Sequence, residues 1–135
     1  MPVILDGKAY AEKILAECAQ RAKLIAAKYG NPPRLRIVTV GSDPASAVYV
    51  RNKKRACKQV GIDCDIERLP ANATEDDLLR AVTDAESLID GCILQLPVPK
   101  HLKQIADYAL DGLMAPRRDV DGLSTYNRGN WGNLE

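Results

Sequence analysis

Hydrophobic and polar positions repeat along the chain with two periods, one typical of helices and one typical of strands. Apolar residues recur at helical spacing over residues 11–29, and Gly30 predicts the end of that helix. Leu35–Val40 is rich in β-branched residues and predicts a buried strand. The chain therefore opens with a helix followed by a strand.

The next segments continue this alternation. Asp43 as N-cap and Pro44 as first helical residue predict a second helix. Ile62–Leu69 alternates apolar with acidic residues, which predicts a half-exposed strand. Thr74 with Asp77 three residues later resembles the capping box of a third helix.

The last part of the chain adds one more strand and one more helix. Cys92–Leu96 is a short, nearly apolar strand segment, and His101–Leu113 is expected to be helical. From Asp119 onward the sequence is rich in Gly and Asn without a clear period, so we expect a loop or a frayed tail. This order predicts an α/β fold, a small three-layer domain with a mostly parallel sheet flanked by helices. We expect one domain over 1–129 and a tail over 130–135.

Composition removes several classes of function. With 46% hydrophobic and 27% charged residues, the 135-residue chain has the composition of one globular domain. Its formal net charge of +1 gives no indication of a nucleic-acid or membrane partner. No apolar run approaches the roughly 20 residues that span a bilayer, and the N-terminus does not resemble a signal peptide.

The four cysteines show no CxxC spacing and fall within apolar elements. We interpret them as reduced core thiols of a cytoplasmic protein, rather than as a disulfide framework or a metal site. The sequence predicts no metal ligand set. The cysteines are Cys18, Cys57, Cys64 and Cys92.

Lys53 is the one lysine on the apolar side of the second helix when residues are placed about 100° apart. The residues on that side are Ala45, Ser46, Tyr49, Asn52, Lys53, Ala56, Cys57 and Val60. The opposite side carries Arg51, Lys54, Arg55 and Lys58 and is interpreted as a solvated face. An ammonium that loses its hydration needs a partner or a chemical task, and proton transfer is one such task. The alternative is that the Lys53 stem extends to water at the helix edge.

Two more polar residues lie where parallel strands place ligands, at their carboxyl ends. Gln95 is the polar residue of Cys92–Leu96, and we expect its amide to meet Lys53. The alternative is an amide bonded to its own loop. Asp121, within Asp119–Gly122, offers a carboxylate on a tight turn, although Asp-Gly turns are mostly structural.

Taken together, three ordered segments resemble the methylenetetrahydrofolate dehydrogenase/cyclohydrolase family. The first is Gly41–Ser46 leading to Tyr49–Lys53, the second is Leu94–Pro99, and the third is Asp119–Gly122 with Asn127–Gly129. The resemblance extends from about Leu5 to about Gly129 and is closest to the bifunctional bacterial form. It implies oxidation of 5,10-methylenetetrahydrofolate with NADP and hydrolysis of the methenyl product to 10-formyltetrahydrofolate, which supplies purine biosynthesis.

The resemblance also implies roles for individual residues. Lys53 would transfer protons and orient the substrate, and Gln95 would bond to Lys53 and tune its protonation. Tyr49 would stack on the folate ring system, and Asp121 would accept hydrogen bonds from the amino-pyrimidine edge of the pterin. Other residues expected to line the same pocket are Val50, Arg51, Asn52, Leu94, Leu96 and Pro97.

The chain departs from the family pattern at two places in its sequence and also in its extent. Arg118 stands where lysine usually precedes the turn, and Ser124–Tyr126 replaces a more typical stretch. The family continues into a Rossmann-type NADP domain, whereas this chain carries no G-x-G-x-x-G and stops first. We therefore expect the folate-binding half alone, without dehydrogenase activity or a cofactor site of its own. Leu134 and Glu135 are interpreted as a cloning remnant.

The resemblance bears on assembly as well. In the family, helices from the end of the chain return to pack on this domain, so we expect exposed apolar surface here. Family dimer contacts lie largely in the cofactor domain, so the full-length protein would be a homodimer. This chain would be a monomer or a non-native dimer.

Two alternatives remain open at this point. The chain could be a stand-alone folate-binding or interaction module without turnover. It could also be an unrelated flavodoxin-like regulatory domain, although three ordered motifs argue against that reading.

Overall fold

The computed structural model of the chain describes residues 6–83, 89–113 and 117–130. Three strands form one sheet in the order β2-β1-β3, and both strand pairs are parallel. The α/β fold with a parallel sheet is therefore confirmed. In chain order the elements are α1 (Gly7–Tyr29), β1 (Arg34–Val40), α2 (Pro44–Val60), β2 (Asp63–Leu69), α3 (Glu75–Thr83), β3 (Gly91–Leu94), η2 (Lys100–Leu102), α4 (Lys103–Tyr108), η3 (Ala109–Leu113) and α5 (Thr125–Asn130).

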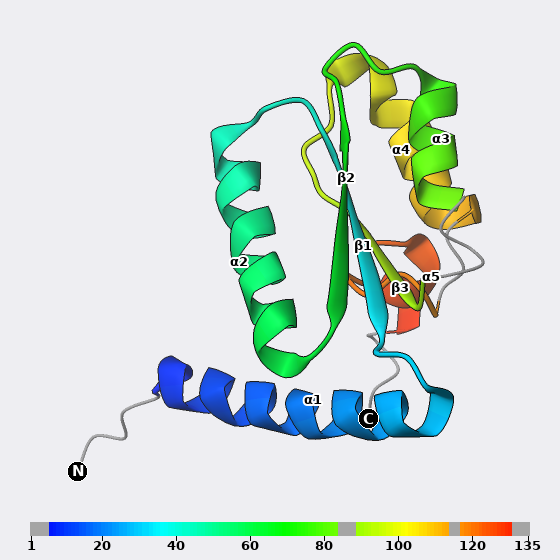
Figure 1. The fold of residues 1–135 in the computed structure, drawn as a ribbon. Helices are drawn as coiled ribbons and strands as arrows, with labels where there is room; N and C mark the ends of the chain where they lie inside the picture. Colours follow the sequence, from blue (N-terminus) through cyan, green and yellow to red (C-terminus); the bar gives the residue numbers. More distant parts are fainter. Residues whose placement is uncertain (1–5, 84–88, 114–116, 131–135) are drawn as a thin grey trace.

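The sheet lies between two helical layers, as Figure 1 shows. Helix α2 covers one face, α3 and α4 cover the other, and α1 lies across the end at which β1 begins. Alternate residues of a strand point to opposite faces, and the core follows that rule. Ile37 of β1 packs with Val50 of α2 and Ile93 of β3. Val38 and Val40 of β1 belong to the second core. Its buried residues are Val38, Val40, Ala73, Leu78, Ala81, Val82, Cys92, Leu94, Leu102, Ala106 and Leu110.

The predicted helix starts agree with the structure. The Asp43 carboxylate accepts the Ser46 N–H at 2.7 Å, and Pro44 is the first residue of α2. At the start of α3, the Asp77 carboxylate accepts the Thr74 N–H at 2.9 Å while the Thr74 hydroxyl accepts the Asp77 N–H at 3.2 Å. Side-chain oxygens thus satisfy N–H groups that a helix leaves without internal partners.

Three details differ from the sequence-based prediction. Strand β3 ends at Leu94, because Pro97 has no N–H to continue the ladder and only the Gln95 N–H still reaches the Val38 carbonyl, at 2.8 Å. The prediction of a loop after Asp119 is wrong in its last part, since 125–130 form helix α5. The helical pattern places Tyr49 on the apolar side of the second helix, yet Tyr49 is 61% exposed, and Val50 is buried against the sheet instead.

Helix α1 is the least buried of the long elements. Ala22 is its buried residue, whereas large apolar side chains along it remain exposed. These exposed side chains are Tyr10, Ile14, Leu24, Ile25 and Tyr29. No helix in the described part of the chain is long and apolar enough to cross a membrane. Of the predicted tail over 130–135, residues 131–135, which include Leu134 and Glu135, lie outside the described residues.

Candidate active site

Lys53 lies at the centre of a polar cluster contributed by three segments of the chain. Its ammonium nitrogen Nζ lies 3.2 Å from Oε1 of Gln95 and 3.3 Å from Oδ2 of Asp121. The Lys53 side chain is 29% exposed and that of Asp121 is 34% exposed, so both groups retain access to solvent. The predicted contact between Lys53 and Gln95 is present. The sequence did not indicate that Asp121 would join them as an ion pair.

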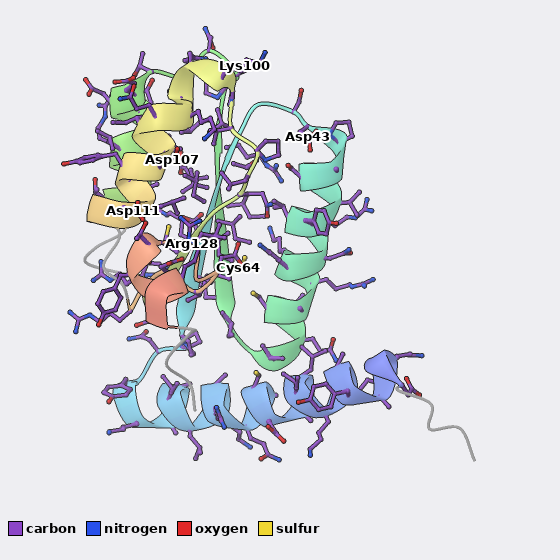
Figure 2. All side chains as sticks on the ribbon, turned by 180° about the vertical axis from the view of Figure 1, so that it is seen from behind. Asp43, Cys64, Lys100, Asp107, Asp111 and Arg128 are labelled. Atoms are coloured by element: carbon purple, nitrogen blue, oxygen red, sulfur yellow. The ribbon has the colours of Figure 1, made fainter. Side chains whose placement is uncertain are left out.

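Helix α2 directs Lys53 towards the carboxyl end of β3. Val50, one turn before Lys53, is 1% exposed and fixes that side of α2 against the sheet. Figure 2 shows Asp43 at the end of α2 where the helix begins, with β1 leading into it. Because the start of α2 and the Val50 contact are both fixed, the Lys53 stem runs along the edge of the core to the cluster.

Gln95 is held on the α2 side of the sheet by strand alternation and by its own amide. It follows Ile93 by two residues, and Ile93 faces α2. The Gln95 amide nitrogen donates to the carbonyl of Leu96 at 3.0 Å, which leaves Oε1 directed at Lys53. The Ser46 hydroxyl donates to the same Leu96 carbonyl at 3.3 Å, so the start of α2 is tied to the segment after β3. The peptide bond between Leu96 and Pro97 is cis.

Asp121 reaches the cluster because its turn runs beside β3. The Cys92 N–H donates to the Arg118 carbonyl at 2.8 Å, and Cys92 forms a parallel bridge with Asp119. Two residues further along, Asp121 therefore lies beside the end of β3, close to Gln95. Gly122 has φ +65°, a left-handed conformation that lets the chain turn directly after Asp121.

Gly91 leaves space for this turn. A Cβ atom at Gly91 would lie 2.7 Å from Cγ1 of Val120, closer than side chains tolerate. Val120 precedes Asp121, so the absence of a side chain at Gly91 allows the turn to lie against β3. No local sequence pattern marks Gly91, because its role depends on a contact between distant segments.

The remaining predicted site residues divide into exposed and buried sets. Tyr49 and Leu96 are 61% and 41% exposed, and Arg51, Asn52 and Pro97 are exposed as well. Val50 and Leu94 are each 1% exposed, so their side chains belong to the core rather than to an open pocket wall. The exposed ring of Tyr49 lies one helical turn before Lys53 and is accessible to a flat ligand.

Three of the four cysteines, Cys57, Cys64 and Cys92, are poor candidates for a competing nucleophile. Burial raises the pKa of the Cys57 thiol, and it raises those of Cys64 and Cys92 to about 11. A thiol with so high a pKa is protonated at neutral pH and is a poor nucleophile. All four cysteines are free, and no cluster of three or more potential metal ligands occurs within 6–83, 89–113 and 117–130.

The starts of α2 and α3 are poorly suited to hold a dinucleotide phosphate. Such sites hold a pyrophosphate at a helix N-terminus after a strand, using exposed backbone N–H groups. Here the start of α2 is already occupied by the Asp43 carboxylate, and α3 begins with Glu75, Asp76 and Asp77. These carboxylates occupy or repel the positions that a phosphate would need.

A large cavity in the described part of the chain lies away from the Lys53 cluster. It measures about 980 Å³ and is lined by residues that include Tyr29, Pro33, Arg34 and Arg118, at the end of the sheet where β1 begins. No residue of the Lys53 cluster lines it. We identify the candidate site from the convergence of Lys53, Gln95 and Asp121, because these groups form one bonded unit at the ligand-binding end of a parallel sheet.

Comparisons with known proteins show the family of the chain. A sequence model of the tetrahydrofolate dehydrogenase/cyclohydrolase catalytic domain matches residues 5–121. The chain is 41% identical over 131 residues to the bifunctional protein FolD of Synechococcus, covering 96% of this chain and 44% of that protein. It is 43% identical over 128 residues to the FolD protein of Polynucleobacter asymbioticus, covering 93% of this chain and 44% of the relative. The chain thus spans less than half the length of these relatives.

Solved structures show the same similarity. A 5,10-methylenetetrahydrofolate dehydrogenase from Bombyx mori superposes with a TM-score of 0.86 at 37% identity, covering 96% of this chain and 44% of that one. The dehydrogenase-cyclohydrolase of Trypanosoma brucei, solved with NADP cofactor and inhibitor, gives a TM-score of 0.84 at 32% identity, with coverages of 96% and 44%. On the extent of these matches and the fold described above, the chain belongs to the tetrahydrofolate dehydrogenase/cyclohydrolase family and corresponds to its catalytic domain.

Proposed function

We propose that this chain binds a reduced folate beside Lys53 and supports one-carbon chemistry on it. The reactions are hydrolysis of 5,10-methenyltetrahydrofolate to the 10-formyl compound and, with NADP, oxidation of the 5,10-methylene compound. The observation that carries the proposal is the joint contact of Lys53 with Gln95 and Asp121, at 3.2 Å and 3.3 Å. Family membership supplies the substrate class.

The chemistry of hydrolysis accounts for the residue types in this cluster. Water adds to the carbon between N5 and N10 of the methenyl cation, and the bond from that carbon to N5 breaks. The incoming water loses both of its protons, of which one is gained by N5 and the other leaves to solvent, so a side chain that relays protons accelerates the reaction. Lys53 carries the titratable nitrogen of the cluster, and we assign the relay to it.

The contacts of Lys53 also suit a ligand. An ammonium has three N–H donors, and the two contacts to Gln95 and Asp121 use two of them. The third is free to meet the bound folate. The Asp121 carboxylate has about four acceptor positions, so it can bind Lys53 and still accept from the amino-pyrimidine edge of a pterin.

We assign Tyr49 to stacking and Gln95 to orienting Lys53. The Tyr49 ring is 61% exposed, and flat heterocycles stack on such rings. Leu96 and Pro97, both exposed, would contact the same ligand from the segment after β3. We infer that Val50 and Leu94 act from the core by fixing the backbone of these segments.

The cofactor proposal rests on relatives. The Trypanosoma brucei enzyme was solved with NADP, and we propose the same cofactor for oxidation in this protein. Carboxylates already stand at the starts of α2 and α3, and we assign none of the described residues to the cofactor. We also propose a cytoplasmic location, supported by the four free cysteines.

A measurement of turnover distinguishes an enzyme from a module that binds folate without catalysing its hydrolysis. The experiment follows the loss of methenyl absorbance with and without protein and, in parallel, titrates the same compound by calorimetry. We expect saturable binding together with hydrolysis faster than in buffer. Binding with hydrolysis at the buffer rate would identify a binding module instead. The absence of binding would contradict the proposal.

A further inference from the structure

Asp119 is a buried carboxylate two residues before Asp121 in the sequence. It is 6% exposed. Its oxygens accept the N–H of Leu123 at 3.2 Å, the N–H of Ser124 at 2.9 Å and the side-chain amide of Asn127 at 2.9 Å. A buried carboxylate is costly unless it is hydrogen-bonded in this way, so the three bonds account for its presence.

These bonds close the chain around Asp121. The Asp119 backbone is paired with Cys92 of β3 on one side, and its carboxylate holds 123–124 on the other. The Asp119 carbonyl accepts the Gly122 N–H at 3.3 Å inside the same turn. Asp121 therefore lies within a loop whose two ends are both fixed by Asp119.

Helix α5 does not need Asp119 as its cap. The Asn127 N–H donates to the Ser124 hydroxyl at 3.2 Å, and the Thr125 N–H donates to the Asp111 carboxylate at 2.6 Å. Figure 2 shows Asp111 beside the start of α5. Since two other side chains cap this helix, the bonds of Asp119 to Leu123 and Ser124 act on the loop itself.

The charge of Asp119 is consistent with this role. Burial raises its pKa, but the hydrogen bonds from Ser124, Asn127 and Leu123 outweigh burial and bring the pKa below its usual value. The carboxylate is therefore ionised at neutral pH and accepts all three bonds. An amide in its place would turn an N–H₂ group towards one of these donors.

We propose that Asp119 is a positioning residue, which closes the 119–124 loop and so holds Asp121 within ion-pair distance of Lys53. Its part in catalysis rests on the function proposed above. Asp119 itself touches neither Lys53 nor the substrate in this assignment.

The first test observes Lys53 directly and does not depend on activity. In protein labelled with [¹³Cε]lysine, the resonance of Lys53 is assigned by its loss in Lys53→Met. Asp121→Ala removes the ion pair and shifts this resonance. We expect Asp119→Asn to shift it in the same direction, by at least half as much. An unchanged Lys53 resonance in folded Asp119→Asn would overturn the proposal.

The second test is a double-mutant cycle on methenyl hydrolysis. Asp119→Asn should lower kcat/KM by about 10-fold or more in the parent, and by less than about 2-fold when Asp121 is already Ala. An equal loss in both backgrounds would mean that Asp119 acts on the fold in general and would overturn the proposal.

Two further variants distinguish a failure of the positioning proposal from a folding defect and from a failure of the proposed function. If Asp119→Asn does not fold, Asn127→Ala removes one donor to the same carboxylate, and both readouts are repeated with it. If Lys53→Met hydrolyses as fast as the parent, the proposed function fails, whereas the resonance of Lys53 still decides whether Asp119 positions Asp121.

Discussion

Two ion pairs of this molecule differ in what they connect. Between the neighbouring strands β1 and β2, Arg34 pairs with Asp63 at 3.3 Å, and the two residues are direct neighbours in the strand register. At the carboxyl end of the sheet, Lys53 pairs with Asp121 at the same distance, although α2 and the turn after 117 are far apart in sequence. The two ion pairs thus have the same N–O distance, although one joins neighbouring strands and the other joins segments far apart in the sequence.

The surroundings of the two pairs explain why only one is a candidate site. Arg34 and Asp63 have 46% and 54% exposed side chains, and pairs so exposed are usually worth about 0–1 kcal/mol. Lys53 and Asp121 are less exposed and share the cluster with the amide of Gln95. The distance within an ion pair therefore does not identify a functional site. Partial burial of the pair and the contact with Gln95 distinguish the Lys53 cluster.

The largest expected difference comes from removing the carboxylate of each pair. Asp121→Ala should lower the rate of methenyl hydrolysis by about 10²-fold or more, because it removes the ion-pair partner of Lys53 and the carboxylate that we propose to bind the substrate. Asp63→Ala is the matched control and should change the rate by less than about 2-fold. The measurement is the initial rate of absorbance loss, corrected for buffer. Equal losses of rate in Asp121→Ala and Asp63→Ala would contradict the claim that only the Lys53–Asp121 pair belongs to the active site.

A smaller effect is expected from moving the turn without touching its carboxylate. Gly91→Ala places a Cβ atom 2.7 Å from Val120 and should displace the Asp121 turn, which lowers hydrolysis by about 10-fold. Gly129→Ala is the control, since nothing lies within 4 Å of a Cβ atom there, and it should leave the rate unchanged. A fully active Gly91→Ala would show that the turn tolerates the shift and that its position is not set by β3.

The smallest effect concerns stability in acid. The pKa of Asp119 is below its usual value, so its contribution to stability is fully present above the unfolded pKa of about 3.9. That contribution is lost as pH falls through the lower pKa of the folded state. Urea midpoints measured between pH 6 and pH 3 should therefore fall less steeply in Asp119→Asn than in the parent. Parallel curves would mean that Asp119 does not contribute to acid sensitivity.

Much of the fold could be predicted from the sequence, because the relevant signals are local. The β-branched run at 35–40 gave β1, and the Asp43-Pro44 pair gave the start of α2 within one turn. The contact between Lys53 and Gln95 also followed, since helix faces and the carboxyl ends of strands have fixed geometry.

The remaining features depend on contacts that no local pattern contains. The ion pair from Lys53 to Asp121 requires the turn to pack beside β3, which in turn requires Gly91. Helix α5 has six residues and no apolar period, and it forms with caps from Ser124 and Asp111. The buried side of α2 lies closer to Val50 than the spacing of its apolar residues indicates, and this leaves Tyr49 exposed.

The central claim is that the partly buried lysine of α2 performs the chemistry, and two adjacent lysines allow a direct test. Lys53→Met removes the ammonium but keeps the length of the stem, and Lys54→Met makes the same change on the exposed face of α2. Both proteins are compared with the parent for loss of methenyl absorbance, after thermal unfolding has shown that both are folded. We expect the rate with Lys53→Met to fall to that of buffer and the rate with Lys54→Met to stay within about 2-fold of the parent. Hydrolysis by Lys53→Met at the parental rate would contradict the account.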